Sequence, residues 1–211
     1  MQEIKNLTDY KLSLRERIEI VAVQAFAEHG IKATKMDDIA AQLAISKRTL
    51  YELYDTKELL LFECIRRHNS MRNQELSSFA ADPRHDVVDI IVYFYRKSIA
   101  KMAVVKPTFY EELTKYPQIV DYLEEQKQRN HDDFLRFIQR GVKEGYFRSD
   151  LNYDIISHIF EALGHYMQHK RLYEQFSFEE LFFNMLFVTL RGFCTPKGID
   201  KLDRAISKDF A

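Results

Sequence analysis

The feature that most limits the fold of this chain is the spacing of its apolar side chains. They recur at steps of three and four residues, as at Ile18, Val21, Ala22, Ala25 and Phe26. This period places them on one side of a helix. The 211 residues include only six Gly and four Pro, so few positions interrupt such helices. Because no stretch has the two-residue alternation of a strand, the sequence predicts an all-α protein.

Helix start and stop signals divide the chain into short helices followed by long ones. Gly30 suits the end of the first helix, and Thr34, Ser46 and Thr56 suit the N-caps of the next three. We expect a polar tail at 1–12, a three-helix domain at 13–60, a second helical domain at 61–196 and a C-terminal tail at 197–211. Residues 77–86, with small side chains and a proline, indicate a linker.

The third helix has an unusual charge placement. Its sequence "SKRTLYELY" (46–54) puts Lys47 and Arg48 in the first turn, where the helix dipole disfavours cations. Three short helices with a tight turn at 44–45 fit a helix-turn-helix, in which the N-terminal residues of the last helix approach the bases of duplex DNA. The alternative is two cations on a solvated turn.

Net charge gives no general argument for nucleic-acid binding. The whole chain has a formal charge of -1, and residues 1–60 contain nine Lys and Arg against ten Asp and Glu. A non-specific basic coat is therefore excluded as the reason for binding. Any DNA contact must come from the local placement of a few side chains.

Residues 15–60 resemble the DNA-binding domain of the tetracycline-repressor (TetR) family of bacterial regulators. The shared pattern consists of an aromatic residue and Gly (Phe26, Gly30), the Thr at 34, "IA" at 39–40, the Ser at 46, "TLY" at 49–51, the aromatic residue at 54 and "KELL" at 57–60. Two positions depart from it. Ala44 stands where members often have Gly, and Ala tolerates a positive φ poorly. Arg48 stands where many members have Gly.

The resemblance implies a set of DNA contacts. Phosphate contacts are expected from Thr34, Lys35, Lys47, Thr49, Tyr51, Tyr54 and Lys57, with Ser46 opening the recognition helix. Arg48 is expected to read a base, because a guanidinium can bind guanine through two hydrogen bonds. The function that the resemblance implies is a DNA-binding transcriptional regulator that acts as a repressor.

A homodimer is expected, since one recognition helix covers too short a half-site for selective binding. Residues 177–193 predict a helix that is apolar around most of its circumference, which indicates burial on more than one side. The expected interface residues are Phe178, Leu181, Phe182, Met185, Leu186 and Thr189. The family resemblance also implies pairing through the last two long helices. The alternative is a central core helix in a monomer.

The resemblance further implies a small-molecule effector in the second domain, whose binding releases a palindromic operator. The candidate lining is aromatic and rich in Met, which indicates a flat or apolar ligand: Tyr93, Phe94, Met102, Phe109, Tyr110, Phe134, Phe137, Tyr166 and Met167. The alternative for each of these side chains is ordinary core packing. No cofactor is expected.

One cluster has residue types that bind metals. His158, Glu161, His165 and His169 fall on one helical stripe. Imidazole and carboxylate groups at this spacing can coordinate a transition metal. The alternative, which we favour, is a polar stripe with Glu161 bonded to His165.

Other function classes have little support. The sequence has no phosphate-binding glycine loop and no nucleophile–base arrangement, so an enzyme is not expected. A helical DNA-binding scaffold without an effector remains open. The longest uncharged apolar run, at 181–190, is ten residues, against about 20 for a membrane span. The two cysteines of the chain have no metal-like spacing. We expect a cytoplasmic protein with reduced thiols and no membrane contact.

Overall fold

A computed structural model of the protein describes residues 2–102 and 104–206, and within them the regular structure is helical. The one β-bridge in this described part is an isolated pairing of Phe147 with Cys194. The all-α fold class is therefore confirmed. The chain divides into two compact units, of which unit 1 comprises Met1–Asn73 and Val104–Glu125 and unit 2 comprises Gln74–Ala103 and Gln126–Ala211.

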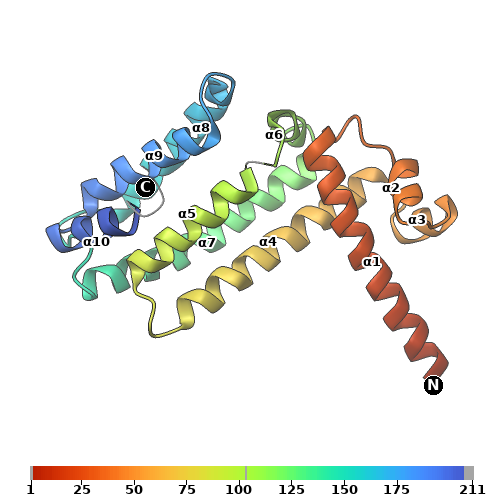
Figure 1. Ribbon diagram of the computed structural model, residues 1–211, viewed down its shortest axis with the longest axis horizontal. Coiled ribbons are helices and arrows are strands. Elements are labelled where there is room, and N and C mark those ends of the chain that lie inside the picture. The colour runs from red at the N-terminus through yellow and green to blue at the C-terminus, as the bar shows by residue number, and fades with distance from the viewer. Residues whose placement is uncertain (1, 103, 207–211) are drawn as a thin grey trace. The chain divides into compact units, whose positions relative to one another are not determined.

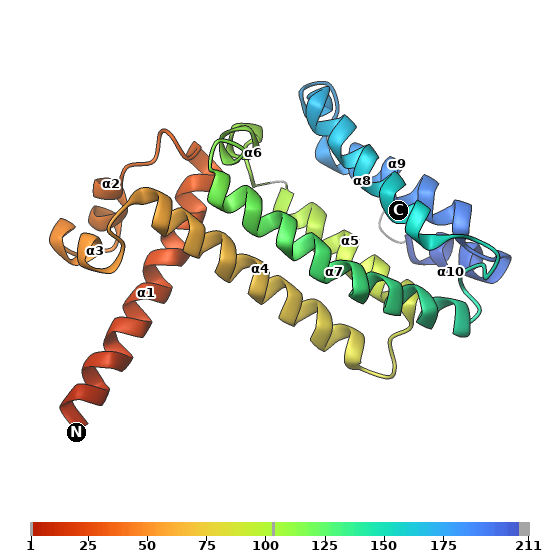
Figure 2. The same ribbon diagram turned by 180° about the vertical axis from the view of Figure 1, so that it is seen from behind.

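Figure 1 labels the helices and Figure 2 shows them from behind. In chain order they are α1 (Gln2–His29), α2 (Met36–Gln42), α3 (Lys47–Leu53), α4 (Lys57–Ala81), α5 (Val87–Met102), α6 (Pro107–Leu113), α7 (Pro117–Lys143), α8 (Tyr153–His169), the 3₁₀ turn η1 (Leu172–Glu174), α9 (Phe178–Phe193) and α10 (Pro196–Ile206). The division between the units falls inside α4 and α7, so the domain boundary expected at residue 60 stays a prediction. Among the described residues, no helix combines the length and apolar character that a membrane crossing needs.

Unit 1 is built around the buried face of α1. Leu14, Ile18, Ala22 and Phe26 are buried at four-residue steps and pack with side chains of α2, α3, α4, α6 and α7. The tail expected at 1–12 is wrong as a description of the backbone, because α1 begins at Gln2. The reason is that residues 2–29 contain neither Gly nor Pro, so nothing interrupts the helix before Gly30.

Unit 2 has its own core, formed by the described side chains of α5, α7, α9 and α10. Tyr95 on α5, Phe187 on α9 and Leu202 on α10 are among the buried residues. The tail expected at 197–211 is wrong for residues 197–206, which lie in α10, while 207–211 lie outside the described residues. Pro196 suits the first position of a helix, and Leu202 and Ile206 bury one face of it. This face is short and lies among charges, so its period is easily overlooked.

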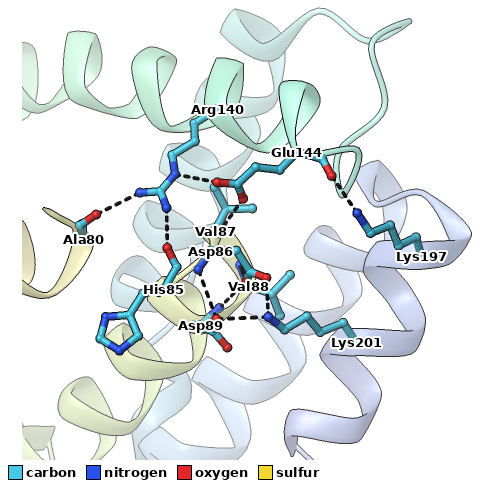
Figure 3. Close-up of polar contacts among 10 residues, drawn as sticks. All are labelled: Ala80, His85, Asp86, Val87, Val88, Asp89, Arg140, Glu144, Lys197 and Lys201. Carbon is cyan, nitrogen blue, oxygen red and sulfur yellow. Dashed lines mark hydrogen bonds and ion pairs between the residues drawn. The ribbon is translucent and has the colours of Figure 1, made fainter. Parts of the chain in front are cut away.

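A polar network joins the α4–α5 connection to α7 and α10 in unit 2 (Figure 3). The Arg140 guanidinium donates to the backbone carbonyls of Ala80, at 2.9 Å, and His85, and pairs with Glu144 at 2.6 Å. Glu144 in turn accepts the backbone N–H of Val87 at 3.0 Å. Part of the linker expected at 77–86 is helical, since α4 continues to Ala81. The carbonyl of Ala80, in the last turn of α4, accepts the hydrogen bond from Arg140.

Candidate nucleic-acid interface

The recognition helix α3 begins with the expected cap. The Ser46 hydroxyl accepts the backbone N–H of Thr49 at 3.0 Å, which satisfies one of the free donors of the first turn. Leu50 is buried in unit 1, whereas the side chains of Lys47 and Arg48 are 66 % and 88 % exposed. The helix therefore presents its two cations to solvent on the side away from its core contact.

The turn between α2 and α3 adopts the conformation that Ala44 was expected to resist. Ala44 has a φ of 53°, in the left-handed region. Its N–H donates to the carbonyl of Ala41 at 3.1 Å, and the N–H of Ile45 donates to that of Ala40 at 3.0 Å. These two bonds form a Schellman motif, which satisfies the carbonyls at the end of α2. The motif holds an alanine in a conformation that glycine adopts more easily.

Both exposed cations have acidic partners in the DNA-free protein. Lys47 pairs with Asp37 of α2, and Arg48 Nε lies 2.8 Å from Glu52 Oε1 one turn along α3. The hydrogen bond from each cation to its carboxylate raises the pKa of Lys47 and of Arg48 above their usual values. Such exposed pairs are weak, so a phosphate or a base edge can replace the carboxylate. Asp37 and Glu52 were not identified from the sequence.

Lys57 has a structural role that the sequence did not indicate. Its ammonium donates to the backbone carbonyls of Ile31, at 2.9 Å, and Thr34, at 3.2 Å. The first residue of α4 is thereby tied to the loop that precedes α2. An ammonium has three N–H donors, so one remains for a phosphate. The phosphate contact expected from Lys57 stays a prediction, together with those expected from Lys35, Thr49 and Tyr51.

Two of the expected contacts are contradicted by their burial. Thr34 is buried, and its hydroxyl donates to the carbonyls of Gly30, at 2.8 Å, and Ala25, at 3.1 Å. It does not cap α2, because the N-cap residue is Lys35, which makes no side-chain cap. Tyr54 is fully buried, and its hydroxyl donates to Glu19 at 2.5 Å. Neither hydroxyl is available to a phosphate.

The nine residues expected to line an effector pocket divide between the two units. Phe109 and Tyr110 pack in the core of unit 1, whereas Phe134 and Phe137 pack against that of unit 2. Tyr93 and Phe94 of α5 and Met167 of α8 are half-buried, and Tyr166 is exposed. The side chain of Met102 lies outside the described residues. The pocket stays a prediction.

The histidine stripe on α8 does not form a metal site. His158, Glu161, His165 and His169 are all exposed, and His158 Nδ1 lies 3.5 Å from Glu161 Oε2. Among the described residues, no three His, Cys, Asp or Glu side chains converge in a way that would hold a metal ion.

Of the residues expected at a dimer interface, Leu181 is buried in its own subunit and the other five are half-buried, so the interface stays a prediction. Leu181 is buried, and the Phe182 ring lies 5.8 Å from the ring of Tyr95, centroid to centroid. Phe178, Met185, Leu186 and Thr189 are half-buried. The large apolar side chains that α8 and α9 leave exposed are different ones: Ile155, Ile159, Tyr166 and Val188. The first three lie on one stripe of α8, which packs beside α9 in unit 2 (Figures 1 and 2).

The sequence and the fold were compared with known proteins. Residues 21–64 match the model of the tetR family of bacterial regulatory proteins. The HTH-type transcriptional repressor KstR2 of Mycolicibacterium smegmatis is 26 % identical over 149 residues, which cover 68 % of this chain and 72 % of the relative. KstR2 of Rhodococcus jostii is 26 % identical over 154 residues, with 70 % and 74 % covered.

Solved structures show the same fold at lower identity. A putative transcriptional regulator from Saccharomonospora viridis, in complex with choline, has a TM-score of 0.70 at 19 % identity and covers 87 % of this chain and 98 % of its own. The ketosteroid transcriptional regulator KstR2 of Mycobacterium tuberculosis has a TM-score of 0.53 at 21 % identity, with 86 % and 95 % covered. These proteins are regulators and not enzymes. The match at 21–64, the capped recognition helix and the shared fold lead to one conclusion: residues 21–64 are similar to the DNA-binding domain of the tetR family, and the chain has the fold of transcriptional regulators.

Proposed function

We propose that the protein is a repressor that binds a palindromic operator as a homodimer and releases it when a small molecule binds its C-terminal helical domain. The observation that carries the DNA-binding part is the exposure of Lys47 and Arg48 at the capped end of α3. In this proposal Arg48 reads a base, and Lys35, Lys47, Thr49, Tyr51 and Lys57 contact phosphates. Residues 13–60 are the DNA-binding domain, and residues 61–196 the effector and dimerisation domain.

The exposed apolar surface of α8 and α9 supports the homodimer. Ile155, Ile159 and Tyr166 lie at four- and seven-residue steps on α8, and Val188 on α9 is 70 % exposed. Four large apolar side chains exposed on two neighbouring helices form an apolar patch, unlike the single apolar residues that are normal on a protein surface. A second copy of the same chain can cover them through a twofold axis, which also places two recognition helices on two half-sites.

Effector binding rests on weaker support and has a separate test. The half-buried aromatic residues of unit 2, such as Tyr93 and Phe94, are the side chains that a ligand would contact. The related repressors, and the similar fold solved with choline, support a ligand-responsive repressor over a scaffold without an effector. A thermal-shift screen of small molecules separates the two, since only a ligand-binding protein is stabilised. A cytoplasmic location accords with this function.

The experiment that tests operator binding is selection of duplex DNA from a random library, followed by fluorescence anisotropy on the enriched sequence. We expect an inverted repeat whose half-sites lie one helical turn apart or a multiple of it. Binding to the repeat should exceed binding to a scrambled duplex of equal length at the same salt concentration. Enrichment of no sequence, or equal binding to both duplexes, would contradict the proposal.

A further inference from the structure

A buried carboxylate lies in the mainly apolar core of unit 1. Glu19 lies on α1 between Ile18 and Ala22, and its side chain is only 10 % exposed. One carboxylate oxygen accepts the Tyr54 hydroxyl at 2.5 Å, and the other lies 3.5 Å from Arg67 Nη1. A carboxylate in such a place is costly unless it is paired and hydrogen-bonded, and these two partners supply both.

The partners of Glu19 come from two segments that follow α3 in the sequence. Tyr54 is the residue directly after α3, and Arg67 lies on α4, where it also pairs with Glu16 of α1. The Arg15 guanidinium lies 5.2 Å from the centroid of the Tyr54 ring. The carboxylate of Glu19 is therefore a junction between α1, the end of α3 and α4, all within unit 1.

The bond from Tyr54 determines how α3 is held. The helix has seven residues, about two turns, and too few of its own hydrogen bonds to set its orientation. Its first turn follows the Schellman turn, and its last turn is anchored by the ring and hydroxyl of Tyr54. Burial and the hydrogen bond to Glu19 both raise the pKa of the Tyr54 phenol, so the hydroxyl stays protonated and donating.

Stability alone is a poor reason for this arrangement. Well-packed apolar side chains of similar size often stabilise a core as well as a buried ionic group does. Arg67 Nε is also buried without a hydrogen-bond partner in the part of the chain that the structure describes. What the network adds is direction, because a short hydrogen bond and an ion pair each permit one geometry, whereas apolar contacts permit several.

We propose that Glu19 is a positioning residue for sequence recognition. By holding the Tyr54 hydroxyl and the Arg67 guanidinium, it fixes the orientation of α3, and hence the direction in which Lys47 and Arg48 leave the helix. This rests on the proposed DNA-binding function and goes beyond it by assigning operator selectivity to three side chains that do not touch DNA.

The test compares Tyr54→Phe with Tyr146→Phe. Tyr146 is the matched control, since its hydroxyl bonds to the Asp86 carboxylate in unit 2, whereas the recognition helix belongs to unit 1. Both variants are measured at a temperature where circular dichroism shows them folded. We expect Tyr54→Phe to weaken operator binding about tenfold, with unchanged affinity and salt slope for scrambled DNA, because no basic side chain is removed. Tyr146→Phe should bind the operator like the wild type.

Two further variants separate positioning from stability. In Glu19→Gln the amide oxygen can still accept from Tyr54 while the pairing with Arg67 is lost, and it should also lose operator selectivity. In the double variant Glu19→Leu/Tyr54→Phe the carboxylate and the phenol are both removed and Arg67 keeps its pairing with Glu16, so stability should recover while selectivity does not. The proposal is overturned if Tyr54→Phe keeps operator affinity within twofold, or if the double variant recovers affinity together with stability. A wild-type protein that shows no operator preference would overturn the proposed function itself, and this inference with it.

Discussion

Val188→Glu tests the proposed dimer surface most directly. About 70 % of the Val188 side chain is exposed, whereas Phe182, the obvious choice from sequence, packs against Tyr95 in the core of its own unit. A charge at Val188 should therefore leave the subunit folded. The introduced charge should weaken only the association of two subunits, because it is buried only when a second subunit covers the α8–α9 surface.

The expected magnitude follows from the exposed area. Burying a valine side chain contributes about 2 kcal/mol, so covering the exposed part of Val188 contributes about 1 kcal/mol for each subunit. Burying an unpaired carboxylate in its place costs roughly 2 kcal/mol more, even where the side chain reaches the edge of the interface. A twofold axis doubles the effect to about 6 kcal/mol. This corresponds to roughly four powers of ten in the dimer dissociation constant.

Sedimentation velocity over a concentration series measures this change. The matched control is Val104→Glu, which introduces the same charge at an exposed valine of unit 1. We expect the control to sediment like the wild type and Val188→Glu to sediment as a monomer that still melts cooperatively. Operator affinity should fall with dimerisation. A Val188→Glu protein that remains dimeric at the lowest measurable concentration would refute the assignment of this surface.

Five other substitutions have defined outcomes. Arg48→Ala should reduce the preference for one base pair of each half-site roughly tenfold to a hundredfold. Lys35→Ala should instead weaken binding to all sequences and flatten the dependence of the binding constant on salt concentration. Anisotropy titrations measure both effects. Arg140→Met removes hydrogen bonds to two backbone carbonyls and should lower the free energy of unfolding in urea by about 2–3 kcal/mol. Burial raises the pKa of Asp86, but hydrogen bonds from Lys201 and Tyr146 outweigh it and lower that pKa to about 2. A carboxyl with a lowered pKa stabilises the fold above about pH 4, so this contribution should disappear between pH 4 and 2 in wild type and be absent throughout in Asp86→Asn. Ala44→Gly should raise the free energy of unfolding by about 0.5–1 kcal/mol, because glycine adopts the φ of 53° without strain.

The sequence predicted those parts of the interface that depend on near neighbours in the chain. The Ser46 cap needs only a residue three positions away, and the outward direction of Arg48 follows from the apolar side that Leu50 defines. The same local reasoning treated Tyr51 and Tyr54 as equivalent phenols on one face. They are not equivalent, because Tyr54 ends the helix with a φ of -141° and an extended backbone, which directs its ring into the core.

The apolar surface shows a similar division. The sequence indicated that α9 is apolar around most of its circumference, but not which side its own unit covers. Packing against α5 places Phe182 and Phe187 beside Tyr95, which leaves Val188 outside. Tyr166 looked like a pocket residue and is exposed on α8 instead. Periodicity identifies an apolar face, and only the neighbouring helices decide whether that face is filled.

What the sequence determined by itself is the all-helical fold, the order of the first helices and the pair of cations at the start of α3, because period, caps and turns act within a few residues. What only the tertiary structure decided is how long-range partners use the remaining groups. Glu19 meets Tyr54 across 35 residues, and Lys57 binds the carbonyl of Ile31 across 26. A hydrogen bond between distant residues depends on the path of the whole chain between them, so no local sequence pattern predicts it.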